Sequence, residues 1–580
     1  MFVEPPDVDN PPVPVAPIFT TADRVTIGRE TFAVRTRELN RSEDLDALQF
    51  LEQFHYKTNR SLGEPETGNH VETNSASVGG RRAVLYAEIK LGTRWEPAGY
   101  VDLQMPLMMC KPRHVLFQRR YAHPTRGISW DHWNQHSIRQ NLNTIVRIAR
   151  VVVTPELRGL GLTRFLLKAA KTFASQRWHV RGVRPVFMEI SAEMLNHVDF
   201  VSSSGFTYVG HTQGNVDRVV KDMAQMSRSR GGEFGIMSLQ RKYLRALGEY
   251  CDAEEISFDA GIEVLRRKVE EPANSLTTGE WAVLRKIVRM PIPYYLCGLD
   301  EYSERYLRDG LTVSQSTRAQ HGLRPKRVEA NKAQLNISDL RLRAEYRLPE
   351  TPSTKLEMAA FGLEGETVHF DIVKGVSATV SGGNVILVSG TSGSGKTALL
   401  KALDPTTREA NVSVGGTVVG SYTTAWLRPI TGALPLFEVL AQRYSADRTF
   451  GALSQVGLSD ALAFVKPYWM LSRGQQYRAM IAELLLREDG VWLLDEFCGD
   501  LDPITAKVVA HNLRKQIVAT GRIAFVASAN HLHYVDALRP TRVLALRAGD
   551  NARWLTYRAY REELEDGDPR RTTKTSKGKA

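Results

Sequence analysis

A glycine-rich segment at residues 390–397 constrains this 580-residue chain more than any other feature. It reads Gly390-Thr-Ser-Gly-Ser-Gly-Lys-Thr397, a complete G-x-x-x-x-G-K-[ST] pattern. The apolar run Val385–Val388 precedes it, and the helix-forming run Ala398–Ala402 follows. Successive amides of such a loop face inward around phosphate oxygens, and the start of the next helix adds partial positive charge. The segment therefore predicts a strand, a phosphate-binding loop and a helix.

A second apolar strand pattern, Val491–Leu494, ends in two carboxylates. Asp495 would ligate Mg²⁺, and Glu496 would activate a water molecule. Three other segments flank this strand. They are Leu471-Ser-Arg-Gly-Gln475 before it, and Gly499-Asp-Leu-Asp502 and Asn530-His531 after it.

Together these motifs resemble the ATP-binding-cassette (ABC) ATPases, whose signature peptide reads L-S-G-G-Q. The resemblance implies a P-loop fold, with ATP and Mg²⁺ as cofactors. It implies catalytic roles for Glu496 and His531, and Mg²⁺ ligation by Thr397 and Asp495. It also implies an ATP site made of Gly390, Ser392, Gly393, Gly395, Lys396, Thr397, Phe361, Ser472, Gly474, Gln475 and Asp502.

The chain departs from the family pattern in three places. Arg473 replaces the first signature glycine, and Phe497 replaces the proline that often follows the catalytic glutamate. No glutamine stands in the segment 429–436, where the family's glutamine loop belongs. ATP binding is therefore expected, whereas the rate of hydrolysis and its coupling stay open.

Two of the implied roles have an alternative residue. Phe361 is assigned to adenine stacking by its distance upstream of the loop, with Phe370 as the alternative, and His533 is the alternative to His531. In this family, the signature serine of one cassette caps ATP held by the P-loop of another. One cassette per chain therefore implies a head-to-tail homodimer that encloses two ATP molecules.

The sequence also indicates where the protein works. No stretch approaches the ~18 consecutive apolar residues of a membrane span. The start at Met1 lacks the basic and then apolar pattern of a secretory signal. We therefore expect a soluble, cytoplasmic protein with no membrane partner, which excludes transport.

A second glycine turn, Arg158-Gly-Leu-Gly-Leu-Thr163, lies between a strand pattern at Ile145–Val153 and a helix pattern at Thr163–Ala174. It resembles the acyl-CoA diphosphate loop of GCN5-related N-acetyltransferases (GNAT), R/Q-x-x-G-x-G/A, with Thr163 in place of the last small residue. The later segment Phe200–Gly210 is similar to that family's closing F-Y-x-x-x-G-F. The resemblance implies that acetyl-CoA or another acyl-CoA is held by Val151, Val153, Arg158, Gly159, Leu160, Gly161 and Thr163.

The acid–base residue of this second site is less defined. The tyrosine that often serves as general acid in GNAT enzymes would fall at Val201, so that role is unfilled. We consider Glu189, Tyr208, His55 and Tyr56 as acid–base or acceptor-side residues, with an ordinary core or surface role as the alternative for each.

The segment 111–150 holds eight Lys or Arg residues against one acid, interleaved with aromatic rings. Positive charge follows a phosphate backbone, and flat rings stack on bases. The alternative is a solvated loop with a few buried rings. The candidate nucleic-acid contacts are Arg113, Arg119, Arg120, Trp130 and Trp133.

The predicted fold class is an α/β multidomain chain. Its expected parts are a disordered Pro-rich tail (1–20), a GNAT-like acyltransferase domain with a mixed sheet and helices (21–212), a mostly helical connector (213–336), an ABC-type ATPase domain (337–560) and a basic disordered tail (561–580).

The whole chain resembles ABC-type ATPases fused to a predicted acetyltransferase domain. The string Arg147–Val153 is also similar to GNAT domains that modify nucleic acid bases, including tRNA cytidine acetyltransferases and Mom-type DNA-adenine modifiers. The formal net charge of +12 favours a polyanionic partner. The leading hypothesis is an ATP-dependent acyl-CoA acyltransferase that modifies a DNA or RNA base. One alternative changes the acceptor to a protein or small-molecule amine, and another is a nucleic-acid-binding ABC switch with an inactive GNAT domain.

Overall fold

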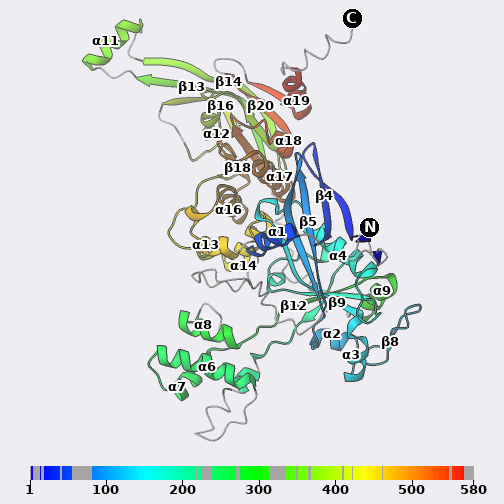
Figure 1. Ribbon diagram of the computed structural model, residues 1–580. Coiled ribbons are helices and arrows are strands. Elements are labelled where there is room, and N and C mark those ends of the chain that lie inside the picture. Colours follow the sequence, from blue (N-terminus) through cyan, green and yellow to red (C-terminus); the bar gives the residue numbers. More distant parts are fainter. Residues whose placement is uncertain are drawn as a thin grey trace, which may run out of the picture.

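The structure is a computed structural model that describes residues 2–3, 13–14, 18–39, 42–54, 81–216, 218–221, 223, 238–269, 275–311, 333–347, 351–362, 367–407, 411–420, 422–459, 461–547 and 552–566. Figure 1 shows an N-terminal α/β body below a C-terminal cassette, with a small helical group projecting at the lower left.

An eight-stranded sheet forms the N-terminal body, in the order β11-β12-β10-β9-β6-β5-β4-β3. All neighbouring strands are antiparallel except β9 and β10, which run parallel. The strands are β3 (Thr20–Ile27), β4 (Glu30–Glu38), β5 (Arg82–Leu91), β6 (Arg94–Gln104), β9 (Ile145–Val153), β10 (Phe187–Ser191), β11 (Thr207–His211) and β12 (Pro293–Gly298).

Helices cover both faces of this sheet. Helix α4 (Leu162–Gln176) presents an apolar stripe in which Leu166 and Phe173 are buried against the cluster that contains Met188 of β10. The next residue along that strand toward the N-terminus, Phe187, belongs to the cluster on the other face. Helices α2 (Lys111–Leu116) and α3 (Gln135–Asn141) lie on that side, whereas α1 (Ser42–Glu52) packs on β6 and β9. A short ladder pairs β7 (Tyr121–Ala122) with β8 (Ser129–Trp130).

Strand β12 corrects the expected boundary of the N-terminal body. It comes from the segment 213–336, for which we expect a mostly helical connector, yet it lies between β10 and β11 with all six residues buried. Helix α9 (Glu301–Gly310) follows and packs on β12. A strand buried on both faces has no alternation of apolar and polar residues, so periodicity does not reveal it.

Three helices within the same segment agree with the expected helical content of this connector. They are α6 (Ser238–Ala253), α7 (Phe258–Lys268) and α8 (Thr278–Ile287), and they pack around their own small apolar core. Figure 1 shows this group projecting away from the eight-stranded sheet.

The cassette contains two sheets. In the six-stranded sheet, ordered β17-β18-β19-β15-β20-β21, the first five strands are parallel and β21 is antiparallel. Its strands are β15 (Val385–Ser389), β17 (Thr424–Trp426), β18 (Val491–Leu494), β19 (Ile523–Ser528), β20 (Arg542–Ala545) and β21 (Arg553–Thr556). The second sheet is antiparallel and consists of β13 (Gln334–Arg347), β14 (Thr367–Ser381) and β16 (Val412–Val419).

The helices of the cassette surround these sheets. They are α11 (Pro352–Phe361), α12 (Lys396–Ala402), α13 (Leu436–Tyr444), α14 (Ala446–Gln455), α15 (Ala461–Val465), α16 (Arg473–Leu486), α17 (Pro503–Thr520), α18 (Val535–Leu538) and α19 (Tyr557–Asp566).

Both ends of the chain differ from the expected disordered tails. At the C-terminal end, α19 carries the chain as a helix through Asp566, where we expect a tail from residue 561. An ion pair joins Arg561 to Glu565 one helical turn further on, a spacing that favours a helix. Near the N-terminus, β1 (Phe2–Val3) pairs with β2 (Val13–Pro14). The expectations for the rest of 1–17 and for 567–580 lie outside the described residues.

The N-terminal body and the cassette share one hydrophobic core. The ring of His197 stacks on Phe450 of α14, with centroids 4.2 Å apart. The β3–β4 turn contacts α18, since Gly28 lies against the Asp536 carbonyl. One buried cluster combines residues of both parts, including Leu157 and Leu160 from the N-terminal body and Leu453, Leu458 and Leu513 from the cassette. The two parts therefore pack as one body.

Within the described residues, no helix has both the length and the apolar composition needed to cross a bilayer.

Candidate functional site

The phosphate-binding loop lies between β15 and α12, in the strand–loop–helix context that its sequence predicts. Lys396 Nζ donates hydrogen bonds to the carbonyl oxygens of Gly390, at 3.0 Å, and Thr391, at 2.7 Å. Gly395 precedes the helix and lies directly against the Ile372 side chain of β14, where a Cβ would overlap it. Ser392 and Gly393 are exposed at the crest of the loop.

Thr397 and Asp495 meet where β15 and β18 end. The Thr397 hydroxyl donates a hydrogen bond to Asp495 Oδ2 at 2.8 Å. A hydroxyl and a carboxylate beside a phosphate loop are the oxygen ligands that Mg²⁺ prefers. Burial lowers the pKa of Lys396, and the charges of Asp495 and Glu496 oppose that shift. These residues fit a nucleoside triphosphate with its Mg²⁺.

Glu496 stands next to this pair on a left-handed backbone, with φ of 47°. Glu496 is exposed, and its backbone amide donates a hydrogen bond to Asp495 Oδ1 at 3.1 Å. Its carbonyl oxygen accepts a hydrogen bond from the Tyr477 hydroxyl of α16 at 3.3 Å. A non-glycine residue in this conformation costs of order 1–3 kcal/mol, and such strain gathers at functional sites.

His531 is buried and hydrogen-bonded on both ring nitrogens. Nδ1 lies 3.1 Å from the Ser528 carbonyl oxygen, which can only accept, so Nδ1 carries the proton. Nε2 then accepts a hydrogen bond from the Tyr560 hydroxyl of α19, and it also lies 3.4 Å from Ser389 Oγ. Burial lowers the pKa of His531. Sequence reasoning missed Tyr560, because nothing in a helix 29 residues away indicates this contact.

The arrangement favours His531 over its alternative His533 as the histidine of the nucleotide site. Ser389 is the last residue of β15, directly before the phosphate loop, so His531 lies beside that loop. His533 Nε2 is buried without a hydrogen-bond partner among the described residues. Burial is the main cause that lowers the pKa of His533, and the charges that affect it are those of Lys507 and Asp502.

The signature residues form the start of α16. Ser472 is the N-cap: its side chain accepts from the Gln475 amide at 3.3 Å, and the Gln475 side chain accepts from the Ser472 amide at 3.1 Å. Gly474 lies against Thr505 of α17. Asp502 caps α17 by accepting from the amides of residues 504 and 505, each at 3.0 Å. The signature and the Asp502 segment therefore meet at neighbouring helix N-termini.

The structure separates the two aromatic candidates for adenine stacking. Phe361 is 80% exposed at the end of α11, which Figure 1 shows at the far tip of the β13–β14 arm, away from α12. Phe370 lies on β14, two residues before Ile372, which contacts the phosphate loop. The alternative, Phe370, is therefore nearer to the nucleotide site, which corrects the assignment of Phe361.

In the N-terminal body, strand β9 extends beyond its parallel partner. The register of β9 with β10 runs from Ile145 opposite Phe187 to Ile148 opposite Ile190. β9 continues to Val153 and stays paired with β6 on its other edge. Residues 151–153 therefore have no β10 partner among the described residues, because β10 ends at Ser191.

The glycine turn that follows has one open side and one covered side. Gly161 is the N-cap of α4 with φ of 80°, and apart from its own neighbours in the chain no described residue has an atom within 4 Å of the position of a Cβ there. Gly159 lies directly against the Asn512 side chain of α17. Leu160 is buried in the shared core, and Thr163 lies in the first turn of α4. The open side combines the N-terminus of α4 with space for an anionic group.

Arg158 turns back onto its own strand. Its Nε donates to the Val153 carbonyl oxygen at 3.0 Å, and its own carbonyl accepts from Asn512 Nδ2 at 3.2 Å. Arg158 therefore fixes the turn, and its Nε is not directed toward a ligand.

Glu189 and Arg113 form a fully buried ion pair, which corrects two predictions. Arg113 Nη1 donates to Glu189 Oε2 at 2.6 Å, and the Tyr294 hydroxyl donates to the same oxygen at 2.6 Å. The Leu107 amide donates to Oε1 at 2.7 Å. Glu189 therefore has no exposed oxygen for acid–base chemistry, and Arg113 is not available to a nucleic acid.

The aromatic candidates for base stacking are also buried. Trp130 and Trp133 are 4% and 2% exposed and pack around Phe117. Arg119 is exposed, but it donates to the Tyr306 carbonyl oxygen at 3.2 Å and lies over that ring. Arg120 forms an exposed pair with an acid at 3.2 Å. The rings therefore build a core, which corrects the prediction that they stack on bases.

Tyr208 is the remaining acid–base candidate within the described residues, because His55 and Tyr56 lie outside them. The Tyr208 hydroxyl lies 2.8 Å from His211 Nδ1. A bulge between Tyr208 and Gly210 brings these side chains together, so strand periodicity could not reveal the pair.

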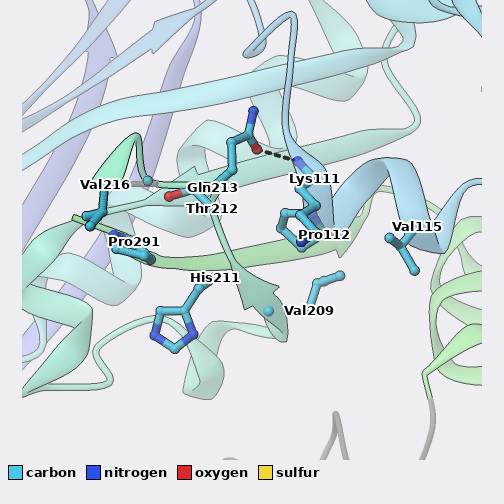
Figure 2. A pocket seen from close by; sticks show the side chains of 11 residues that line it. Lys111, Pro112, Val115, Val209, His211, Thr212, Gln213, Val216 and Pro291 are labelled. Carbon is cyan, nitrogen blue, oxygen red and sulfur yellow. Dashed lines mark hydrogen bonds between the residues drawn. The ribbon is translucent and has the colours of Figure 1, made fainter. Parts of the chain in front are cut away.

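A cavity of about 480 Å³ opens beside this strand. Figure 2 shows His211 at its edge and the Lys111 amide donating to Gln213 Oε1, at 2.7 Å. The remaining lining is largely apolar. It consists of Pro112, Val115, Val209, Gly210, Thr212, Gly214, Val216 and Pro291.

Comparison with known proteins identifies the cassette. The family model for the ABC transporter matches residues 373–499. The phosphonates import ATP-binding protein PhnC of Caulobacter vibrioides is 32% identical over 212 residues, which cover 30% of this chain and 78% of that protein. The lipoprotein-releasing system ATP-binding protein LolD of Jannaschia sp. is 29% identical over 210 residues, or 32% of this chain and 90% of that protein.

Among solved structures, CbiO1 from Clostridium perfringens, part of the ABC transporter complex CbiONQ, is similar at 17% identity with a TM-score of 0.31, covering 40% of this chain and 93% of that one. The sequence matches coincide with the phosphate loop, the paired Thr397 and Asp495, and the capped signature helix. The chain therefore belongs to the ABC family through a C-terminal ATP-binding cassette.

Proposed function

We propose that this protein is an ATP-controlled acyltransferase that transfers an acyl group from acyl-CoA to an amine. The ABC cassette binds ATP and Mg²⁺, and the N-terminal body holds the acyl-CoA substrate. Its diphosphate would lie at the open side of the Gly161 turn, against the first amides of α4, and its acyl arm along residues 151–153 of β9.

One observation carries the acyl-CoA assignment. β9 extends beyond the end of β10. It leads through a glycine turn that is open around Gly161 into the N-terminus of a fifteen-residue helix. Such an end is an anion site, because its amides have no partners within the helix. The resemblance to GNAT enzymes rests on this same segment, and the β9 residues that lack a β10 partner support it in addition to the motif.

The reaction needs a group that accepts a proton. The amine nitrogen forms a bond to the acyl carbon, the carbon–sulfur bond breaks, the amine loses a proton and the CoA thiolate gains one. We assign this transfer to the hydrogen-bonded pair of Tyr208 and His211, because His211 lines the cavity. Val201, where the family's tyrosine would stand, is fully buried and takes no part.

The acceptor that we propose is a base of DNA or RNA. The exposed cations that remain after the buried residues are set aside include Lys111, which lines the cavity, and Arg139 of α3. An exocyclic base amine must leave its duplex before it can react, at a cost of a few kcal/mol, and an ATP-driven clamp can supply that work. The volume of the cavity also suits a small-molecule amine, which is the second candidate acceptor.

Two chains would form the ATP-bound state. Ser472 and Asp502 lie at helix N-termini on the cassette surface, and ATP would be enclosed between one chain's phosphate loop and the other chain's Ser472. We therefore propose a head-to-tail homodimer with two ATP molecules.

Nucleoside mass spectrometry tests this function. DNA and RNA are isolated from cells that express the wild-type protein, Lys396→Ala or no protein. We expect a nucleoside that is heavier by one acyl group in the wild-type sample alone. An unmodified nucleoside pool, together with acyl transfer by the purified protein to small amines, would support the second acceptor. Failure of both would exclude acyl transfer.

A further inference from the structure

We propose that Arg478 and Asn512 of the cassette are positioning residues for the acyl-CoA loop, so that ATP and CoA bind in a linked manner. This inference rests on the proposed function. It concerns contacts between helices α16 and α17 and the segment 155–159 of the N-terminal body.

Arg478 is the stronger of the two contacts. Its side chain is 2% exposed, and it crosses from α16 into the N-terminal body. Nη1 donates to the Pro155 carbonyl oxygen, and Nη2 donates to the Glu156 carbonyl oxygen at 2.6 Å. Nη1 also lies 3.4 Å from the Gly457 carbonyl oxygen. One guanidinium therefore joins the turn before the glycine loop to two parts of the cassette.

Asn512 makes the next contact along the same segment. It is buried on α17, donates to the Arg158 carbonyl oxygen at 3.2 Å and fills the space beside Gly159. Gly457 lies on the far side of Arg158, in contact with its backbone and Cβ. The carbonyls of residues 155, 156 and 158 are thus all held by cassette side chains, immediately before the open turn at Gly161.

Burying an arginine in this way is costly. Desolvation lowers the pKa of Arg478 to about 10, and the nearby Arg158 charge adds to that effect. No carboxylate pairs with it among the described hydrogen bonds, which go to backbone carbonyls. A buried cation that is held by carbonyls of both the N-terminal body and the cassette is sensitive to small displacements of either part.

The same two helices begin at the nucleotide-dependent motifs. Helix α16 starts at the signature residue Ser472, and α17 starts at Asp502. Tyr477, the neighbour of Arg478, donates to the backbone carbonyl of Glu496. Adjacent residues of α16 therefore contact the catalytic carboxylate's backbone and the turn before the CoA loop. A shift of this helix when ATP is enclosed must change the loop, or break these bonds.

Thermodynamic linkage gives the consequence a measurable form. If ATP binding changes the affinity for CoA by some factor, CoA changes the affinity for ATP by the same factor. Couplings between protein sites are typically ~5- to 150-fold. We expect a factor of at least ~5 in the intact protein, and a factor close to one when the contacts at 155–159 are removed.

Calorimetric titration of CoA measures this factor. The full-length protein is titrated with CoA in the presence and absence of a non-hydrolysable ATP analogue with Mg²⁺. The variants are Arg478→Gln, Arg478→Lys and Asn512→Ala, and the melting temperature of each is measured to confirm that it is folded. Arg522→Lys is the matched control, because Arg522 is also buried and donates to a carbonyl, that of Arg487, within the cassette.

The expected result is a CoA affinity that changes at least ~5-fold with the analogue in the wild type and in Arg522→Lys. In Arg478→Gln and Asn512→Ala, both ligands should still bind, but the ratio of the CoA affinities with and without the analogue should approach one. Arg478→Lys should keep part of the difference between these affinities. Wild-type protein that binds CoA equally with and without the analogue would overturn the linkage and leave the proposed function intact. Wild-type protein that binds no CoA in either state would overturn the proposed function, and the linkage with it.

Discussion

The Tyr560 hydroxyl donates a hydrogen bond to His531 Nε2, so the last described helix of the chain covers this histidine. The same hydroxyl lies 3.1 Å from Ser389 Oγ, directly before the phosphate loop. Nε2 is the nitrogen that a neutral His531 of this tautomer could offer only as an acceptor. To donate a hydrogen bond to a phosphate from Nε2, His531 must lose the hydrogen bond from Tyr560 and carry a proton on Nε2.

Removing the Tyr560 hydroxyl should therefore raise ATP hydrolysis. The net value of one hydrogen bond is ~0.5–1.5 kcal/mol, and 1.4 kcal/mol is a tenfold ratio, so Tyr560→Phe should raise the rate by ~2- to 10-fold. The measurement is steady-state phosphate release. Tyr557→Phe is the control, because Tyr557 lies on the same helix as Tyr560 but its hydroxyl donates to Asp536 of α18. An unchanged or lower rate in Tyr560→Phe would contradict a restraining role.

The buried histidine also predicts how stability depends on pH. Burial lowers the pKa of His531, helped by the charges of Lys396 and His533 and opposed by the Ser528 carbonyl. The folded state thus favours the neutral ring, and the unfolded chain binds more protons below its ordinary pKa of ~6.5. The contribution of the neutral His531 ring to the free energy of unfolding is therefore complete above pH ~6.5 and is lost as the pH falls below it. We expect the melting temperature of His531→Asn to fall less than that of the wild type between pH 7.5 and 5.5. Parallel curves would contradict this.

The proposed head-to-tail dimer makes a direct prediction for Glu496, the proposed catalytic carboxylate. Glu496→Gln keeps the shape of the side chain but cannot activate water, so it should bind ATP and accumulate as a dimer. Light scattering after size exclusion, with and without ATP and Mg²⁺, gives the mass. Lys396→Ala should stay monomeric under both conditions. A Glu496→Gln protein that binds ATP but remains a monomer would count against the enclosed dimer.

The Arg113–Glu189 pair should matter for stability. Glu189→Gln leaves the Arg113 charge buried without its counter-ion and weakens three hydrogen bonds. Breaking a buried pair by removing one partner costs about 3–5 kcal/mol. Denaturant unfolding of the full chain measures the loss. Replacing both residues by apolar ones, Arg113→Met with Glu189→Leu, should recover much of it. A wild-type unfolding curve for Glu189→Gln would contradict the structural role.

Local motifs could be predicted well from the sequence. The strand, loop and helix around residues 385–402 and the strand Val491–Leu494 before Asp495 stand where their patterns indicate. Each of these depends on a few consecutive residues, because glycines and an apolar run determine the backbone locally.

Burial and long-range contacts could not be predicted in the same way. Rings interleaved with arginines suit a base-stacking surface as well as a core, and only tertiary packing places Trp130 and Trp133 inside. Strand β12 is separated from its neighbour β11 by the whole helical group. The contact of Tyr560 with His531 and that of Arg478 with residue 155 join distant segments, for which a single sequence carries no periodic signal.

The most direct test of the account is calorimetric titration of CoA into the wild type, Gly161→Asp and Gly161→Asn. Asp and Asn have the same shape and both tolerate the left-handed backbone at this position, so only the charge differs. We predict that the wild type and Gly161→Asn bind CoA, and that the carboxylate of Gly161→Asp abolishes binding by repelling the diphosphate. Equal affinity of Gly161→Asp and Gly161→Asn, or no binding by the wild type, would contradict a CoA site at the start of α4.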